Sequence, residues 1–432
     1  MKILLVGNGG RENALAWKIF NSRSFQESSG TIYCTVGNPG IEEFAKSIKI
    51  KAIETDLLAD YALKENIDFT VVGPEVPLAS GIVNKFNQKG LKIFGPTKEA
   101  AEIESSKIFS KRLMADNDIP TAKYKKFTRD NLKEVKSFLE VCSYPVVIKA
   151  DGLAAGKGVI ISENFDESIS AINEFSSSDT LLSAGTDFII EEFLSGEEIS
   201  VFVITDGSDY VVLPYAQDHK KILDGEKGKN TGGMGAVSPV MKFENEGLGK
   251  IIKDRIIDPT LKALKLEGRE FKGCLYCGLM IVDNEPYVIE FNCRFGDPET
   301  QAVLPLIESD FLNLLMASSR GEIKNYKLVC NNKYSCCVVL ASKGYPGNYN
   351  INKEIADLTN DNDNVLIFHS GTKFSDEKKI VSAGGRVLSV VGISENSLED
   401  ALRNAYNKAS EIDFENKYFR KDIGFRQLTV NS

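Results

Sequence analysis

Histidine is almost absent from this chain, and its scarcity argues against a zinc centre. Only His219 and His369 occur among 432 residues. The eight cysteines are scattered, and the one C-x-x-C pair, Cys274-Leu-Tyr-Cys277, has no second pair at zinc-ribbon distance. A structural zinc site needs four such ligands. We therefore expect the cysteines to be small buried thiols.

Excess basic charge and long apolar runs are also missing. The chain carries 52 Lys and Arg against 61 Asp and Glu, a net charge of -9. Nucleic-acid binding requires a basic face, so a general nucleic-acid binder is excluded. No apolar run reaches the roughly 18 residues of a membrane helix, and the apolar start of MKILLVGNGG is too short for a signal peptide. We expect a cytoplasmic protein that acts on small molecules, with no membrane or nucleic-acid partner.

Length and pattern together indicate several domains. A chain of 432 residues is too long for one ordinary hydrophobic core. In the first hundred residues strands alternate with helices, which predicts a doubly wound parallel sheet of the α/β class. The expected elements are strands at 3–6, 31–36, 69–72 and 92–94 and a helix at 13–20.

Two changes of pattern divide the rest of the chain. After Gly95-Pro-Thr97 a polar helix is expected at 98–116, followed by hairpins and irregular segments typical of an α+β region. Beyond residue 326 the pattern predicts strands at 336–341 and 386–391 and an amphipathic helix at 397–410. The predicted domains are therefore residues 1–100, 101–326 and 327–432.

A glycine-rich turn, Gly7-Asn-Gly-Gly-Arg-Glu12, follows the first strand and opens a helix. It fails the dinucleotide fingerprint, because Glu12 occupies the third glycine position and the second strand ends without a carboxylate for a ribose. Helix N-termini still bind anions, and Arg11 adds a donor fork. The turn favours a phosphate-bearing substrate over NAD, with a plain tight turn as the alternative. Glu75, after a later strand, is expected to contact the same ligand.

The stretch 147–159, VIKADGLAAGKGV, reads as a strand, a glycine loop and a second strand. Lys149 closes the first strand, and Lys157 lies between Gly156 and Gly158. Glycines let backbone amides approach an anion closely, and lysine brings positive charge to phosphate. Taken alone, the stretch fits either a phosphate-binding hairpin or a solvated surface turn.

The stretch 288–294, VIEFNCR, predicts a strand with one polar face. Because side chains alternate along a strand, Glu290, Asn292 and Arg294 point to the same side. The residues expected to face the core are Ile289, Phe291 and Cys293. Carboxylate and amide oxygens one rung apart suit Mg²⁺, and an arginine on the next rung can stabilise a developing oxyanion. An edge strand with a polar outer face is the structural alternative.

The order of these motifs resembles the ATP-grasp superfamily, in which two lobes hold a nucleotide and a glycine hairpin covers its phosphates. The likeness extends to one family, phosphoribosylamine–glycine ligase (glycinamide ribonucleotide synthetase). The segments that carry it run from residue 7 to residue 388 and are GNGGREN, GPEVPLASG, KADGLAAGKGV, QDHKK, NTGGMGA, EFNCRFGDPETQ and SAGGRVL.

The resemblance implies an N-terminal doubly wound parallel-sheet domain, a central two-lobe ATP-grasp domain and a small C-terminal α/β domain. It also implies ATP-dependent ligation of glycine to 5-phosphoribosylamine, through glycyl phosphate, in purine biosynthesis. The chemistry would need Mg²⁺ or Mn²⁺, with ATP as a substrate. We expect the protein to be a monomer.

Site roles follow residue by residue from the matching motifs. The ATP ligands would be Lys107, Lys149, Gly156, Lys157, Gly158, Glu191, Phe193, Leu194 and Glu198. The catalytic residues would be Arg294 and Lys157, and the metal ligands Glu290 and Asn292. The substrate-binding residues would be Gly9, Gly10, Arg11, Glu75, Asp218, Lys220, Gly232, Gly233 and Asp297.

The chain departs from the pattern at two places. Asn13 stands where the family has histidine after GGRE. Tyr276-Cys-Gly278 stands where many ATP-grasp enzymes carry a second acidic metal ligand. Two rival readings keep parts of the same site: another ATP-grasp carboxylate–amine ligase or carboxylase subunit, and a nucleotide-binding protein without turnover.

Overall fold

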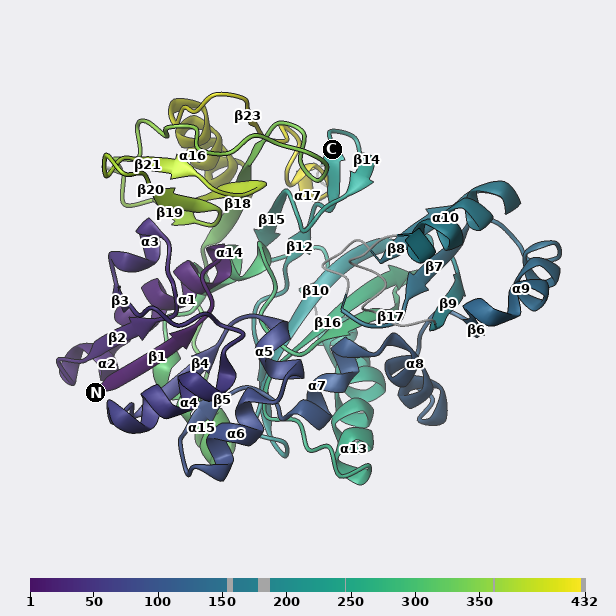
Figure 1. The fold of residues 1–432 in the computed structure, drawn as a ribbon, viewed down its shortest axis with the longest axis horizontal. Helices are drawn as coiled ribbons and strands as arrows, with labels where there is room; N and C mark the ends of the chain where they lie inside the picture. The colour runs from purple at the N-terminus through teal and green to yellow at the C-terminus, as the bar shows by residue number, and fades with distance from the viewer. Residues whose placement is uncertain (154–157, 178–186, 245, 360–361, 429–432) are drawn as a thin grey trace.

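The computed structural model describes residues 1–153, 158–177, 187–244, 246–359 and 362–428. Three sheet-containing regions follow one another along the chain (Figure 1). None of the helices in these ranges is both long and apolar enough to cross a membrane.

The N-terminal region is a parallel sheet in the order β3-β2-β1-β4-β5. Its strands are β1 (Lys2–Val6), β2 (Thr31–Cys34), β3 (Ala45–Ser47), β4 (Phe69–Val72) and β5 (Ile93–Phe94). Its helices are α1 (Gly10–Phe20), α2 (Arg23–Glu27), α3 (Pro39–Glu42), α4 (Thr55–Lys64), α5 (Glu75–Ala79) and α6 (Ile82–Gln88).

Both faces of this sheet are covered, which confirms the doubly wound prediction. Ile3 and Leu5 pack into one apolar cluster with α1, whereas Leu4 and Val6 pack into another with α4 and α6. A parallel sheet is stable only when both faces are buried. The glycine turn therefore lies at the carboxyl end of β1, the edge where such sheets bind ligands.

The helix expected at 98–116 is wrong as a single element, because the chain breaks at Ser106. The break separates α7 (Lys98–Ser105) from α8 (Lys107–Asp116). Ser106 has an extended backbone, and its hydroxyl accepts a hydrogen bond from the Phe109 amide at 3.1 Å. Serine stabilises a helix start in this way more than it stabilises a helix interior. The break places Lys107 in the first turn of α8.

The central region contains two antiparallel sheets. One has the order β6-β9-β7-β8 and lies with α9 and α10 at the right of Figure 1; the other has the order β11-β10-β16-β17. The strands are β6 (Tyr124–Thr128), β7 (Val146–Ala150), β8 (Val159–Ser162), β9 (Asp187–Glu192), β10 (Glu197–Thr205), β11 (Tyr210–Val212), β16 (Gly273–Val282) and β17 (Glu285–Asn292). The helices are α9 (Leu132–Leu139), α10 (Phe165–Ser177), α12 (Glu246–Ile252), α13 (Asp258–Leu266), α14 (Glu299–Val303) and α15 (Phe311–Arg320), with a π-helical turn at Lys253–Ile257.

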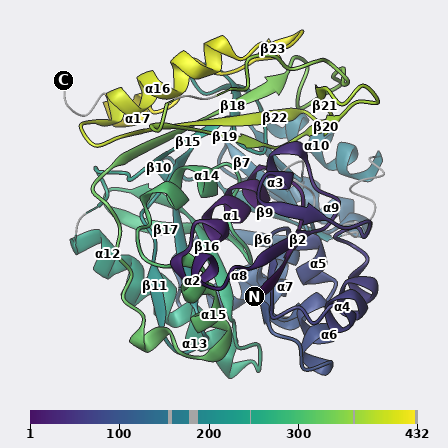
Figure 2. The ribbon, with the colours of Figure 1, turned by 90° about the vertical axis from the view of Figure 1, so that its left-hand side faces the viewer.

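The C-terminal region is an antiparallel sheet in the order β12-β15-β18-β22-β19, with β23 beside β18. The elements are β18 (Tyr334–Ser342), β19 (Val365–His369), β20 (Thr372–Phe374), β21 (Ile380–Ser382), β22 (Arg386–Ser394), α16 (Leu398–Glu411), β23 (Lys417–Tyr418) and α17 (Phe425–Leu428). Figure 2 shows α16 lying along this sheet at the top of the molecule. Two strands, β12 (Gln217–Asp218) and β15 (Gly235–Ser238), come from the central region. Between them, β13 (Lys221–Leu223) and β14 (Lys227–Asn230) form a separate hairpin.

Candidate active site

A cavity of about 650 Å³ lies between the two central sheets and brings together most of the residues singled out in the sequence. Those that line it are Arg11, Glu75, Lys107, Lys149, Gly158, Glu191, Phe193, Leu194, Glu198, Asp218, Lys220, Gly232, Glu290, Asn292, Arg294 and Asp297. Gly156 and Lys157 lie outside the described residues.

One wall of the cavity holds buried lysines. Lys149 on β7 donates to the carbonyl of Ile289 at 3.0 Å and pairs with Glu191 at 2.9 Å. Lys111, which the sequence analysis missed, approaches the other oxygen of Glu191 at 3.3 Å. Burial lowers the pKa of Lys111 to about 8. The Glu191 carboxylate is thus held between two ammonium groups. Lys111 lies four residues after Lys107, and that helical spacing was the signal that could have found it.

Lys107 approaches the same cavity from the start of α8. Its ammonium donates to the carbonyl of Gly152 at 2.8 Å, close to the glycine loop. Burial, which the nearby Glu290 opposes, lowers the pKa of Lys107. A partly desolvated ammonium that donates to a backbone carbonyl is well suited to receive an anionic ligand.

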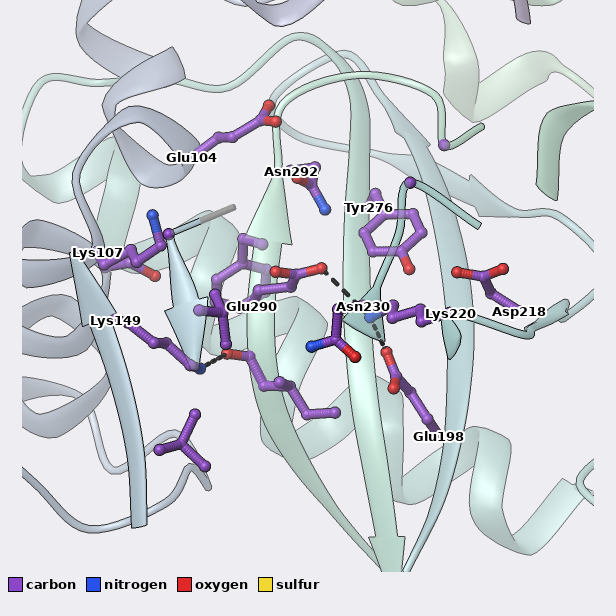
Figure 3. Close-up of a pocket in the computed structure, with 18 of the residues that line it drawn as sticks. Glu104, Lys107, Lys149, Glu198, Asp218, Lys220, Asn230, Tyr276, Glu290 and Asn292 are labelled. Carbon is purple, nitrogen blue, oxygen red and sulfur yellow. Dashed lines mark hydrogen bonds and ion pairs between the residues drawn. The ribbon is translucent and has the colours of Figure 1, made fainter. Parts of the chain in front are cut away.

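An ion-pair chain crosses the cavity floor (Figure 3). Lys220 bonds the carboxylate of Glu198, and its ammonium lies 3.6 Å from the carboxylate of Glu290. Although burial disfavours its charge, Glu198 and Glu290 raise the pKa of Lys220 well above its usual value. Although burial opposes ionisation of Glu290, Lys220, Lys149 and Lys107 lower its pKa. Glu290 is therefore a carboxylate at neutral pH.

Strand β17 presents its polar face to this cavity, as predicted, with one exception. Glu290 and Asn292 line the cavity, whereas Phe291 and Cys293 belong to the buried core at 3% and 1% exposure, although Phe291 also borders the cavity. Ile289 was expected in the core, and this was wrong. Glu290 pairs with Gly278 and Val288 with Leu279, so a bulge leaves Ile289 out of register and turns it toward the cavity.

Arg294 lies just beyond β17 and is held by a set of acceptors. Its guanidinium bonds Glu75 at 3.1 Å, Glu104 at 2.9 Å, the Asn292 amide oxygen at 3.2 Å and the Phe295 carbonyl at 3.3 Å. Although burial disfavours its charge, Glu104 and Glu75 raise the pKa of Arg294. Glu104, on α7, was missed because no local pattern links it to a residue 190 positions away.

Glu75 is ionised and belongs to this cluster of charges. Burial opposes its ionisation, but the guanidinium groups of Arg294 and Arg11 lower the pKa of Glu75 to about 2. Arg11 in turn bonds the Glu12 carboxylate at 2.6 Å and the Phe295 carbonyl at 3.0 Å. Its donor fork is thus directed mainly at the interior and at the large cavity.

A second cavity, of about 360 Å³, lies at the start of α1. Its lining combines residues from the N-terminal, central and C-terminal regions: Asn8, Gly9, Gly10, Gly37, Asn38, Asp297, Tyr345, Ser370, Gly371, Thr372, Ala383 and Arg386. A side chain at Gly10 would lie 2.3 Å from the Ser370 hydroxyl, so only glycine fits there. The Gly9 amide donates to the Glu12 carboxylate at 2.6 Å, and the remaining amides at the start of this eleven-residue helix favour an anion.

Arg386 joins the two cavities and was missed as a site residue. Its guanidinium pairs with the Asp297 carboxylate at 3.1 Å and donates to the carbonyls of Asp297 and Gly232 at 2.8 and 2.5 Å. It lines both cavities. The signal was present, because Arg386 is the arginine of the SAGGRVL segment.

Gly233 and Asp218 lie together beside the loop at 231–234. Gly233 has φ +106, and a side chain there would lie 2.3 Å from Pro298 and 2.8 Å from the Asp218 carboxylate. Burial and the neighbouring carboxylate of Glu299 raise the pKa of Asp218 well above its usual range. Asp218 therefore holds a proton more readily than an ordinary aspartate.

Asn13, which stands where the family has histidine, lines neither cavity. Its side-chain oxygen accepts from the His369 amide at 2.7 Å, and the residue is 1% exposed. In this structure Asn13 joins the N-terminal region to β19.

The donor set suits a hard divalent cation. Within the described ranges no group of three or more His, Cys, Asp and Glu side chains could hold a metal ion. Glu290 and Asn292 supply two oxygens on one face, and Gly278 and Tyr276 are their partners on β16. Mg²⁺ commonly takes one or two protein oxygens and completes its shell with water and phosphate oxygens. The residues present fit that mode of binding.

Two antiparallel sheets around a cavity lined by lysines and a Glu-x-Asn strand define an ATP-grasp enzyme. Family models agree along the chain: those of phosphoribosylglycinamide synthetase match residues 1–104 (N domain), 105–300 (ATP-grasp domain) and 335–426 (C domain). The chain belongs to the phosphoribosylamine–glycine ligase family and is a ligase.

Individual relatives support the same assignment. Phosphoribosylamine–glycine ligase of Caldanaerobacter subterraneus is 44% identical over 423 residues, which cover 98% of this chain and 99% of the relative. The crystal structure of the Thermotoga maritima ligase superposes with a TM-score of 0.83 at 33% identity and covers 98% of this chain and 100% of that one. Biotin carboxylase from Campylobacter jejuni shares the fold alone, with a TM-score of 0.72 at 16% identity, covering 96% of this chain and 92% of that one.

Proposed function

We propose how the two cavities carry out the reaction of this ligase. The enzyme joins glycine to 5-phosphoribosylamine at the expense of ATP and yields glycinamide ribonucleotide, ADP and phosphate in purine biosynthesis. One observation carries the proposal: lysines, the Glu290–Asn292 face and Arg294 line the same cavity. Arg386 connects this cavity to the second one, at the start of α1.

The chemistry has two steps. A carboxylate is a poor electrophile, so the terminal phosphoryl group of ATP first passes to a carboxylate oxygen of glycine and ADP leaves. The amine of phosphoribosylamine then attacks the acyl carbon, the bond to the phosphate oxygen breaks, and the amine loses a proton. Such a reaction depends mainly on positioning and on charge stabilisation by the protein.

ATP occupies the cavity between the central sheets. Lys107, Lys149 and Lys157 neutralise its phosphates, and Gly156 and Gly158 let the loop backbone approach them. The nucleoside lies along Glu191, Phe193, Leu194 and Glu198. The half-exposed ring of Phe193 supports this placement, because it offers an apolar surface to a base within the cavity.

Glu290 and Asn292 would hold a Mg²⁺ or Mn²⁺ ion. When bound, the ion would neutralise charge on the phosphate oxygens. Arg294 reaches the same face and stabilises the transferring phosphoryl group or the oxyanion that forms when the amine attacks. Its bonds to Glu75 and Glu104 fix its orientation, which supports a role in positioned charge stabilisation.

The phosphate of phosphoribosylamine binds at the second cavity, against Gly9 and Gly10 at the start of α1. Glycine and the ribosyl amine lie between that point and Arg294. The residues assigned to these two substrates are Arg11, Glu75, Asp218, Lys220, Gly232, Gly233 and Asp297; Gly233 lines neither cavity and lies beside Asp218. Arg386, which faces both cavities, supports a continuous path for the substrate.

The protein works as a cytoplasmic monomer. The net charge of -9 supports substrates that bind in local cationic sites rather than nucleic acid. Sedimentation equilibrium of the purified protein at micromolar concentration tests this directly. A monomer would give a mass near the 47.6 kDa of the chain, and a dimer a mass near twice that value.

A coupled ADP-release assay with single substrates omitted tests the reaction. We expect release only when ATP, glycine and phosphoribosylamine are all present, and no release when bicarbonate replaces glycine. Release with bicarbonate and without glycine would support the carboxylase alternative instead. ATP binding without any release would support a nucleotide-binding protein.

A further inference from the structure

The β13–β14 hairpin (residues 221–230) contributes cavity residues although it belongs to no larger sheet. Lys221, Glu226 and Asn230 line the large cavity, and Lys220 immediately precedes the hairpin. Among the strands that the structure describes, β13 and β14 pair only with each other. A two-stranded hairpin is marginally stable in water on its own. Its position must therefore come from contacts with another part of the chain.

The C-terminal segment (residues 418–427) makes these contacts, and Figure 1 shows β14 and α17 near one another. Tyr418 donates to the carbonyl of Ile222 at 2.8 Å, and the Lys421 amide donates to the Asp224 carboxylate at 2.9 Å. The Gly424 amide donates to the ring of His219 at 3.0 Å. The C-terminal segment thus bonds His219 on one side of Lys220 and Ile222 and Asp224 on the other.

Arg420 makes the largest share of the contacts between this C-terminal segment and the hairpin. It is fully buried, with 0% exposure. Its guanidinium donates to the Lys221 carbonyl at 3.0 Å, to Glu226 at 2.7 Å and to both oxygens of Asp422 at 2.7 and 2.9 Å. Asp422 in turn accepts from the amide of Gly225 at 2.8 Å. A planar fork can satisfy these acceptors at once, whereas a lysine ammonium cannot.

The hairpin carries this constraint to the cavity through Lys220. The Lys220 carbonyl accepts from both the amide and the hydroxyl of Thr231 at 2.8 Å, so the base of the hairpin is closed. From that base the Lys220 side chain reaches Glu198 and Glu290. A shift of the hairpin would move Lys220 away from the carboxylate that faces the phosphates.

We propose that Arg420 is a positioning residue, which acts from the C-terminal domain and holds the hairpin so that Lys220 stays paired with Glu290. The proposal rests on the proposed function of the large cavity. Misplacement of a reacting group by about 1 Å can lower a rate by roughly 100-fold. Loosening the hairpin should therefore reduce turnover, although Arg420 lines neither cavity.

The test is Arg420→Lys, with Val390→Ala as a matched control. Val390 is fully buried in the C-terminal core, where it pairs with Val338 on β18 and Ile367 on β19. Thermal melting measures the loss of stability in both variants. We expect Arg420→Lys to lower kcat at saturating substrates by about 10- to 100-fold and to speed amide exchange at 221–230, and Val390→Ala to do neither.

Two results would overturn the proposal: unchanged kcat in Arg420→Lys, or reduced kcat with exchange at 221–230 like that of the unaltered protein. Tyr418→Phe removes only the bond to the Ile222 carbonyl and is read in the same way, so the test holds if Arg420→Lys does not fold. Amide exchange is measured without substrate turnover, so a failure of the positioning proposal can be told apart from a failure of the ligation reaction itself.

Discussion

Replacing Arg294 by lysine keeps one positive charge near the cavity but removes a planar donor group. The guanidinium satisfies Glu75, Glu104, the Asn292 oxygen and the Phe295 carbonyl together. An ammonium on a shorter reach can pair with one carboxylate at a time. The lysine ammonium can still pair with Glu104, and Glu75, whose side chain is 25% exposed, keeps Arg11 at 3.9 Å. The variant therefore avoids the cost of about 3–5 kcal/mol that an unpaired buried carboxylate would bring. The variant should therefore fold.

The rate should fall much further than the stability. Removing one preorganised electrostatic donor from an active site typically costs roughly 10²–10³ in kcat, or about 3–4 kcal/mol of transition-state stabilisation. We expect that loss for Arg294→Lys in steady-state ADP release, with the affinity for a non-hydrolysable ATP analogue within a few-fold of the starting value. Calorimetric titration measures that affinity.

Arg255→Lys is the matched control, because Arg255 pairs with Glu285 on the surface at about half exposure. It should leave turnover unchanged. If Arg294→Lys turns over at a rate near that of the unaltered enzyme, Arg294 has no part in the chemistry. If its affinity for the ATP analogue collapses in parallel with kcat, its role is in binding ATP.

Three further predictions concern β17 and His369. Glu290→Gln should raise the Mg²⁺ concentration needed for activity more than Asn292→Asp, which keeps an oxygen ligand and adds charge; equal or reversed effects in a magnesium titration would contradict the metal assignment. Phe291→Ala should lower the unfolding free energy by roughly 3–5 kcal/mol without changing that requirement in the folded fraction, which a denaturant titration beside the magnesium titration checks. Burial lowers the pKa of His369 to about 4. As the pH falls, the unfolded chain protonates this imidazole near pH 6.5, whereas the folded protein does so only near pH 4. The free energy of unfolding should therefore fall by roughly 3 kcal/mol as the pH drops through that window. His369→Gln should flatten the slope of melting temperature against pH between those values, and an unchanged slope would refute the assignment.

Local patterns predicted much of the fold. The strands of the N-terminal sheet are short apolar runs, and their helices follow at regular intervals, so the sequence was sufficient to predict a doubly wound sheet. The alternation in VIEFNCR correctly predicted that Glu290 and Asn292 share a face and that Phe291 is buried. These features depend on neighbours in the sequence.

The errors and omissions depend on distant contacts. Ile289 leaves the core because β17 slips by one residue against β16, and register belongs to the pair of strands. Glu104 and Lys111 enter the site because the break at Ser106 directs α7 and α8 toward β17 and β9. The four-residue spacing of Lys107 and Lys111 places both on one side of α8, but neither helix gives a local sign of the strand that it meets. The residues at 154–157, which include Gly156 and Lys157, lie outside the described ranges, so their predicted contact with ATP remains a prediction.

The most direct test of the account follows the oxygen atoms of glycine. Glycine labelled with ¹⁸O in its carboxylate is incubated with ATP, phosphoribosylamine and the enzyme, and the released phosphate is examined by mass spectrometry. If glycyl phosphate forms and the amine then displaces phosphate, each phosphate carries one labelled oxygen, in step with the glycinamide ribonucleotide formed. Unlabelled phosphate released alongside that product would contradict activation of glycine by phosphoryl transfer.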